Sequence, residues 1–215
     1  MSAETELSRE ELREALKERI GGELLDKYEK AAVAVCGLGG LGSNIAISLA
    51  RAGIGRLILI DFDTVDITNM NRQQYKVSQI GMAKCEALRD NLLEIAPYIE
   101  LELHQTRMDF TNYGRLLEDA DVICEAFDKA EEKSRLVDFV MENMPDKYLV
   151  SGSGMASLRS PNAIKTRRLT NKFYICGDFE SDVDVDGSLF APRVMLCAAH
   201  QATTVLRILA GETEV

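Results

Sequence analysis

The strongest constraint on the fold is a glycine-rich segment set between two short apolar runs. Residues 32–36 read AVAVC and residues 56–60 read RLILI. Such runs are typical of strands that are buried on both faces of a sheet. Between them lies GLGGLG at residues 37–42, followed by an apolar helical pattern through Ile45, Leu49 and Ala52. Strand, glycine turn, helix and strand together predict a βαβ unit.

The remainder of the chain continues this alternation. Helices are expected at about 82–95, 129–144 and 192–210, strands at 98–104, 120–127 and from 148, a hairpin at 163–167 and 173–176, and loops at 62–78, 151–154 and 178–188. We predict an α/β fold, a Rossmann-like doubly wound and largely parallel sheet that ends in a C-terminal helix. Before the sheet, Ser8 and Glu11 form a capping-box pattern, so residues 1–30 are predicted as an N-terminal helical segment ahead of one domain over 31–215.

The glycine loop predicts a nucleotide site. It satisfies G-x-G-x-x-G after a predicted strand and before a predicted helix, where the backbone turns tightly and the helix N-terminus favours an anion. Asp61 ends the second strand, where a carboxylate reaches a ribose hydroxyl. These features alone leave a dinucleotide oxidoreductase and an ATP-dependent enzyme both open.

The segment after Asp61 separates these two classes. It contains D-x-D at 61–63, N-x-x-R-Q at 69–73, a lysine at Lys84 and an aspartate at Asp128 after the fourth predicted strand. Over residues 30–210 this order of motifs resembles the ThiF/MoeB family, the bacterial relatives of ubiquitin-activating enzymes. The segments NRQQY, EAFD and APRV with AAHQA are similar to a short ThiF-like subgroup of sulfur carrier protein adenylyltransferases.

The resemblance implies an activity and the partners for it. Family members use ATP and Mg to adenylylate the C-terminal glycine of a small ubiquitin-like sulfur carrier ending in Gly-Gly, with release of pyrophosphate. We therefore expect residues 31–215 to form a ThiF-like ATP-binding adenylation domain that activates a carrier of the ThiS type in thiamine biosynthesis. Another carrier or a peptide substrate, an NAD-dependent Rossmann oxidoreductase and a non-catalytic nucleotide-binding scaffold remain alternatives.

The resemblance also implies roles for individual residues. Asp61 would hold the ribose, Arg72 and Lys84 would contact the phosphates, and Asp128 would hold Mg unless it only caps the following helix. The expected nucleotide-binding set is Gly37, Gly39, Gly40, Gly42, Asp61, Asp63, Asn69, Arg72, Gln73 and Lys84.

Three family features are altered or absent in this sequence. Family enzymes are homodimers in which an N-terminal arginine reaches the partner's ATP. No arginine-rich motif is recognisable here, and Arg13 is favoured over Arg9 and Arg19 for that catalytic role. The two C-x-x-C pairs of many relatives are missing, so no zinc is expected. Of the five cysteines, Cys176 at the edge of a polar loop is the best candidate for a covalent step with the carrier.

Charge and hydropathy exclude other partners. The chain has 35 acidic and 25 basic residues among 215, a net charge of −10. A nucleic acid or an anionic membrane needs a basic face, so neither is expected as a partner. No apolar run approaches the ~18 residues of a membrane span. The polar, acidic start resembles neither a signal nor a transit peptide, which predicts a cytoplasmic location.

Overall fold

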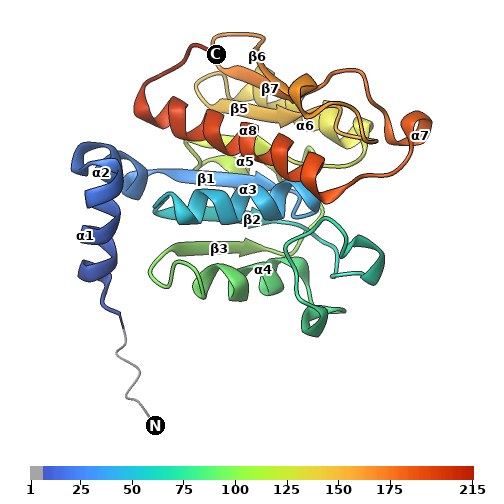
Figure 1. Cartoon of the computed structure of the whole chain (residues 1–215). Helices are drawn as coiled ribbons and strands as arrows, with labels where there is room; N and C mark the ends of the chain where they lie inside the picture. The colour runs from blue at the N-terminus through green and yellow to red at the C-terminus, as the bar shows by residue number, and fades with distance from the viewer. Residues whose placement is uncertain (1–6) are drawn as a thin grey trace.

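A computed structural model describes residues 7–215. A seven-stranded sheet with the strand order β3-β2-β1-β4-β5-β7-β6 forms its centre (Figure 1). The strands are β1 (Ala32–Cys36), β2 (Arg56–Ile60), β3 (Glu100–His104), β4 (Val122–Glu125), β5 (Tyr148–Gly152), β6 (Lys165–Arg168) and β7 (Phe173–Gly177). All neighbours are parallel except the β6–β7 hairpin. The predicted Rossmann-like, doubly wound fold is confirmed.

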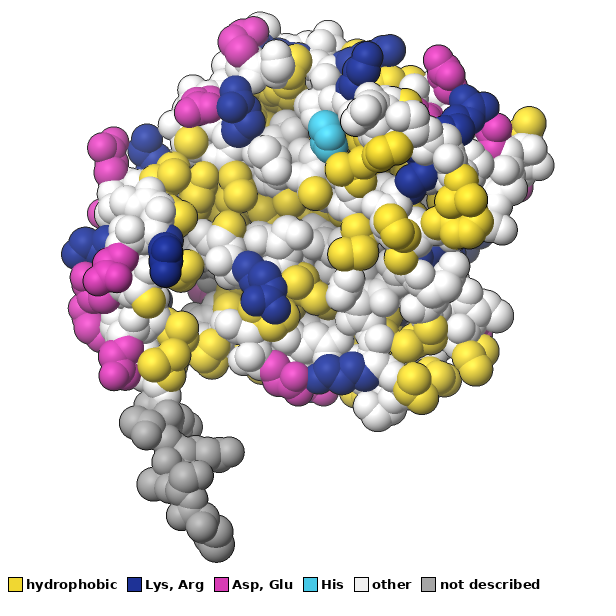
Figure 2. Space-filling view, viewed as in Figure 1, with side chains coloured by type: hydrophobic (Ala, Val, Ile, Leu, Met, Phe, Trp, Pro, Cys, Tyr) yellow, Lys and Arg dark blue, Asp and Glu magenta, His cyan; other side chains and the backbone are white. Residues whose placement is uncertain are grey.

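Helices cover both faces of this sheet. They are α1 (Arg9–Ile20), α2 (Gly22–Lys30), α3 (Gly40–Arg51), α4 (Lys84–Leu93), α5 (Tyr113–Leu117), α6 (Ala130–Asn143), α7 (Val183–Asp186) and α8 (Ala191–Ala210). Short 3-10 turns lie at η1 (Ile67–Asn69), η2 (Val77–Gln79) and η3 (Pro161–Ala163). Helices α3, α4 and α8 contribute to one hydrophobic core, while α5 and α6 contribute to a second core on the opposite face. Figure 2 shows the first of these faces from outside.

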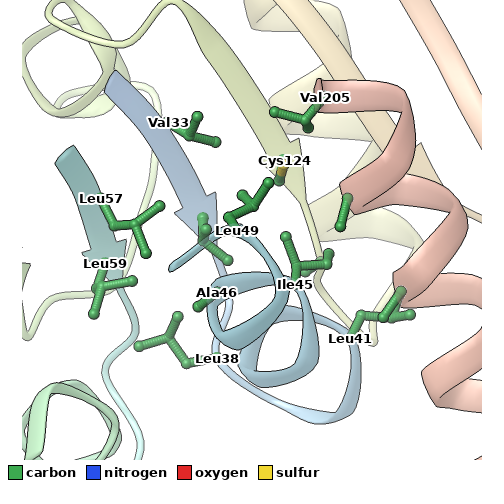
Figure 3. Packing of buried hydrophobic residues seen from close by; sticks show 14 of the residues in the cluster. Val33, Leu38, Leu41, Ile45, Ala46, Leu49, Leu57, Leu59, Cys124 and Val205 are labelled. Atoms are coloured by element: carbon green, nitrogen blue, oxygen red, sulfur yellow. The ribbon is translucent and has the colours of Figure 1, made fainter. Parts of the chain in front are cut away.

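The first core explains why the apolar runs form central strands. All five residues of β1 are buried, because α3 and α8 pack on one face and α5 and α6 on the other. Figure 3 shows the side chains of α3 packed against β1, β2 and β4. The labelled residues of this cluster are Val33, Leu38, Leu41, Ile45, Ala46, Leu49, Leu57, Leu59, Cys124 and Val205.

The predicted elements differ from the structure mainly at their ends. Ser151 and Gly152 were expected in a turn but complete β5, because they pair with β7. The short helix α5 was not predicted, and α7 interrupts the expected acidic loop. The Ser8–Glu11 capping box is present at the start of α1. Residues 1–6 of the predicted N-terminal segment lie outside the described residues, and within 7–215 no helix has the length and hydropathy to cross a membrane.

Candidate active site

The glycine loop joins the carboxyl end of β1 to α3, and close backbone contacts fix its shape. A Cβ atom on Gly42 would lie 1.8 Å from the carbonyl oxygen of Gly37. Gly37 has φ +92°, and a Cβ there would lie 2.9 Å from the carbonyl oxygen of Ala126. Gly39 is the N-cap of α3, and no side chain caps this helix. The start of α3 therefore provides backbone N–H groups for an anion.

Asp61 follows β2 and is anchored directly to this loop. Its Oδ2 accepts a hydrogen bond from the N–H of Leu38 at 2.6 Å, and its Oδ1 accepts one from the N–H of Asp63 at 2.8 Å. Asp61 is buried, and burial raises the pKa of its carboxyl above the ordinary value, although Lys84 and the two N–H donors oppose that shift. The carboxylate is thus held beside the turn where a ribose hydroxyl would donate to it.

Lys84 brings a buried cation to the same place. Its Nζ lies 3.1 Å from Asp63 Oδ2 and 3.9 Å from Asp61 Oδ2, and its side chain is 8% exposed. The chain positions it through the backbone, because the N–H of Lys84 donates to the carbonyl of Asp63 and Thr64 forms a β-bridge with Ala83. Asp61 and Lys84, which are 23 positions apart in the sequence, therefore lie in one charged cluster with Asp63.

The N-x-x-R-Q segment lies over the glycine loop. A Cβ on Gly40 would lie 3.3 Å from Cγ of Arg72, so the stem of that arginine lies against the loop. Its guanidinium donates to Asn69 Oδ1 at 2.9 Å. Gln73 is buried, its Nε2 faces Gly39, and its Oε1 has no hydrogen-bond partner among the described residues. An unpaired buried acceptor beside the loop fits a ligand that donates hydrogen bonds, as a nucleotide does.

Other polar side chains hold this segment in place, in a role that the sequence pattern did not predict. The hydroxyl of Tyr75 donates to the carbonyl of Leu38 at 2.7 Å, and Asn44 Nδ2 donates to the carbonyl of Arg72 at 3.2 Å. Ser43 Oγ accepts the N–H of Gln74 at 3.1 Å. Asn71 and Tyr75, the first and last residues of the NRQQY motif, each donate a hydrogen bond to a backbone carbonyl. Their residue types alone do not reveal these contacts.

Asp128 approaches from the other side of β1. It lies on the loop of residues 126–129 between β4 and α6, and this loop packs directly against Gly37. The alternative role of Asp128 as a helix cap is excluded, because Lys129 is the N-cap of α6 and Asp128 precedes it. Asp128 is exposed, and residues 7–215 contain no group of three His, Cys, Asp or Glu side chains that could hold a metal alone. This arrangement fits Mg²⁺, which commonly uses one or two carboxylates together with substrate phosphates.

Arg13 is the one predicted site residue that the fold does not bring to this cluster within one chain. It lies on α1, where its guanidinium forms ion pairs with Asp26 at 2.5 Å and Glu29 at 3.0 Å on α2. Helices α1 and α2 precede the amino end of β1, whereas the glycine loop follows its carboxyl end (Figure 1). Arg9 and Arg19 lie on the same helix.

Cys176 is not at the edge of a loop in the structure. It is fully buried in β7, and burial raises the pKa of its thiol despite hydrogen bonds with Thr166 and Thr204. The other four cysteines are also free and buried. A thiol in this position has neither the exposure nor the lowered pKa of a reactive cysteine.

Comparison with known proteins identifies the family. The model of the ThiF family matches residues 12–215. This chain belongs to the ThiF family. It is 46% identical over 92 residues to ubiquitin-like modifier-activating enzyme 5 of Caenorhabditis elegans, which covers 40% of this chain and 22% of that protein. It is 35% identical over 156 residues to adenylyltransferase and sulfurtransferase MOCS3 of Anopheles gambiae, covering 70% of this chain and 35% of that protein.

Solved structures of two E. coli proteins share the fold. The E. coli tRNA N6-threonylcarbamoyladenosine dehydratase TcdA in complex with ATP has a TM-score of 0.85 at 20% identity, over 96% of this chain and 97% of that one. E. coli MccB with ATP has a TM-score of 0.69 at 23% identity, over 89% and 59%. The chain spans about a third or less of the length of the two curated relatives described above.

Proposed function

We propose that this chain adenylylates the C-terminal carboxylate of a small ubiquitin-like sulfur carrier of the ThiS type, consuming ATP in thiamine biosynthesis. The observation that carries the proposal is the buried Lys84 beside Asp61 and Asp63, next to a glycine loop over which Arg72 lies. The name of one relative, ubiquitin-like modifier-activating enzyme 5, supports a ubiquitin-like protein as substrate, and the name of another, adenylyltransferase and sulfurtransferase MOCS3, supports adenylylation.

The chemistry requires neutralisation of charge more than proton transfer. A carrier carboxylate is already ionised at neutral pH, so it attacks the α-phosphorus of ATP without a general base. A new C–O–P linkage forms, the bond to the β-phosphate oxygen breaks, and pyrophosphate leaves. Lys84 and Arg72 would stabilise the negative charge that builds up on the phosphates, the lysine as a point charge and the arginine as a planar fork.

Asp128 would hold Mg²⁺ against the phosphates. The metal ion, when bound, acts as a Lewis acid that neutralises phosphate oxygens. The chain's own part is to present that carboxylate at the carboxyl end of β4 while Asp61 orients the ribose at the carboxyl end of β2. This divides ribose binding and metal binding between the strands on either side of β1.

The residues of this site support an oxidoreductase or a tRNA-binding enzyme less well. An NAD-dependent oxidoreductase explains the glycine loop and Asp61 but gives no role to a buried lysine and an arginine at the phosphates. TcdA is described as acting on tRNA, whereas this chain carries a net charge of −10, which opposes binding of a polyanion. Another carrier or a peptide would use the same chemistry and is distinguished only by the substrate itself.

A pyrophosphate-exchange assay tests the proposal. The chain is incubated with ATP, Mg²⁺, labelled pyrophosphate and a purified ThiS-like carrier, and label entering ATP is measured. We expect exchange that depends on the intact C-terminal Gly-Gly and falls at least ~100-fold in Lys84→Met, while Lys76→Met, which breaks a surface pair with Glu94, serves as the matched control. Tight NAD binding without exchange refutes the proposal. Exchange with a different carrier, a peptide or tRNA retains adenylylation but changes the substrate.

The proposal includes a homodimer and a cytoplasmic enzyme. The outward face of α8 supports an interface, because four of its five exposed positions carry no charge: Pro192, Met195, Ala199 and Thr203. The fifth, Arg207, lies in the last turn of the helix. Figure 2 shows hydrophobic and uncharged atoms over the centre of that face. Arg13 would act on the partner's nucleotide only after release from its pairs on α2. Sedimentation of Met195→Glu tests the interface, and unchanged exchange in Arg13→Ala removes that residue from the mechanism.

A further inference from the structure

Glu125, the last residue of β4, is a buried carboxylate that the proposed mechanism does not use. Its side chain has no exposed surface, although it lies three residues before Asp128. A buried carboxylate is unfavourable unless hydrogen bonds and an opposite charge compensate for lost hydration. The hydrogen-bond partners of the Glu125 carboxylate therefore show which segments stabilise it and which segment it keeps in position.

Its two oxygens connect three segments. Oε1 accepts the N–H of Phe127 at 2.7 Å, inside the loop that carries Asp128. Oε2 accepts a hydrogen bond from Lys133 Nζ at 2.5 Å, on α6, and another from the hydroxyl of Ser151, on β5. The loop of residues 126–129 is thus fixed to its own strand, to the helix after it and to the neighbouring strand.

The backbone around Glu125 is fixed as well. Gln201 Nε2 on α8 donates to the Glu125 carbonyl at 3.1 Å, and the N–H of Ala126 donates to the carbonyl of Cys36 at 2.9 Å. The loop then packs so closely on Gly37 that a Cβ there would lie 3.1 Å from a ring carbon of Phe127. The position of Asp128 relative to the glycine loop consequently depends on the carboxylate that holds this loop.

We propose that Glu125 and Lys133, with Ser151, are positioning residues that set Asp128 for Mg–ATP. This inference rests on the proposed function. The side chain of Glu125 is not exposed and that of Lys133 is 22% exposed, so the carboxylate is shielded from solvent and its geometry is constrained. In this proposal the three side chains need no contact with the nucleotide, because each acts through the loop.

A double-mutant cycle distinguishes positioning from plain stabilisation. ATP binding is measured by calorimetry in EDTA and across Mg²⁺ concentrations for wild type, Asp128→Asn, Glu125→Gln/Lys133→Met, and the three changes combined. The Glu125→Gln/Lys133→Met protein leaves no buried charge unpaired and so keeps the test valid if Lys133→Met alone does not fold. Arg135→Met, which removes a surface cation from the same helix, is the control.

We expect the paired substitution to raise the Mg²⁺ requirement of ATP binding roughly tenfold, as loss of an outer-shell partner of a metal ligand typically does. Binding in EDTA should change less than about twofold, and exchange of the Phe127 amide hydrogen should accelerate. Added to Asp128→Asn, the pair should have little further effect on the Mg²⁺ requirement, because the groups act as one unit.

An unchanged Mg²⁺ requirement in a folded Glu125→Gln/Lys133→Met protein overturns the inference while leaving the proposed function intact. Effects that add to those of Asp128→Asn also overturn it, since they assign the pair to general stability. A wild-type chain that binds no ATP overturns the proposed function and this inference with it. ATP binding to which Asp128 makes no contribution overturns the assignment of Asp128 as metal ligand, and this inference with it.

Discussion

Replacement of Lys84 by Met removes the only cation that the described structure places within ion-pair distance of the buried Asp61. The two charged atoms are 3.9 Å apart, and both side chains are less than a tenth exposed. At the effective dielectric constant of about 20 that suits such sites, the attraction is roughly 4 kcal/mol. The second pair, with Asp63, contributes less because half of the Asp63 side chain is exposed. We therefore expect Lys84→Met to lower the free energy of unfolding by roughly 3 kcal/mol at pH 7.

The stability deficit of Lys84→Met should depend on pH in a defined direction. Burial already raises the pKa of Asp61, and loss of the lysine removes a favourable charge, so the pKa rises further. An acid whose folded pKa is raised binds its proton more tightly in the folded state. Stability is unaffected below the unfolded pKa, near 3.8, and falls as pH rises from there to the folded pKa. The deficit of Lys84→Met should therefore be small near pH 4 and larger at pH 7.

Urea unfolding across this pH range measures the effect. Lys76→Met, at an exposed ion pair, should change stability by less than ~1 kcal/mol at every pH. Asp61→Asn combined with Lys84→Met should regain most of the lost stability, because no buried charge remains, while ATP still raises its Tm less than it raises that of wild type. A deficit independent of pH, or a double variant as unstable as the single one, would refute this account of the cluster.

Three further predictions follow from the packing. Arg193→Met should destabilise the chain by roughly 3 kcal/mol at pH 7, because it breaks the buried ion pair with Asp178. Burial acts to raise the pKa of Asp178, but backbone hydrogen bonds and the guanidinium lower that pKa overall. This contribution is therefore present above about pH 3.8 and lost as pH falls through the folded pKa, so urea unfolding should show the variant's deficit shrinking in acid. Native protein should react with a thiol reagent only on unfolding, and Cys176→Ala should retain carrier-dependent exchange; a fast-reacting native thiol would contradict the burial. Gly42→Ala should weaken calorimetric ATP binding at least ~10-fold and destabilise by several kcal/mol, because its Cβ would overlap the Gly37 carbonyl; unaltered binding would count against that loop geometry.

The fold was predictable because its central strands are apolar on both faces. Residues 32–36 and 56–60 form β1 and β2 with the expected bounds, since burial by helices on both faces demands uninterrupted apolar runs. The predicted ends of strands were less accurate where pairing with a neighbouring strand decides them, as at Ser151 and Gly152, which pair with β7. The five-residue helix α5 was missed because so short a helix depends on tertiary packing of Tyr113, Leu116 and Leu117 rather than on a periodic pattern.

The candidate site was predictable in part. Asp61, Arg72 and Lys84 came from their order in a motif, and the structure places them around one glycine loop, although their roles remain predictions. The burial of the Cys176 thiol was misjudged because an acidic loop follows it in sequence at residues 178–188, whereas α8 covers it in space. Glu125 escaped notice since a glutamate at a strand end normally faces solvent, and only the fold shows that it does not.

The strand order explains why one glycine loop receives groups from both sides. The chain adds β2 and β3 on one side of β1 and β4 and β5 on the other, so the direction of strand addition reverses at β1. At such a point two loops diverge and leave a crevice at the carboxyl ends of the strands. Here Asp61 binds the loop through Leu38 on the β2 side, and the Asp128 loop packs on Gly37 on the β4 side. Each side is held by its own ion pair with a buried carboxylate. Substitution of Lys84 should therefore affect the ribose and phosphate contacts, whereas substitution of Lys133 should affect the Mg²⁺ requirement.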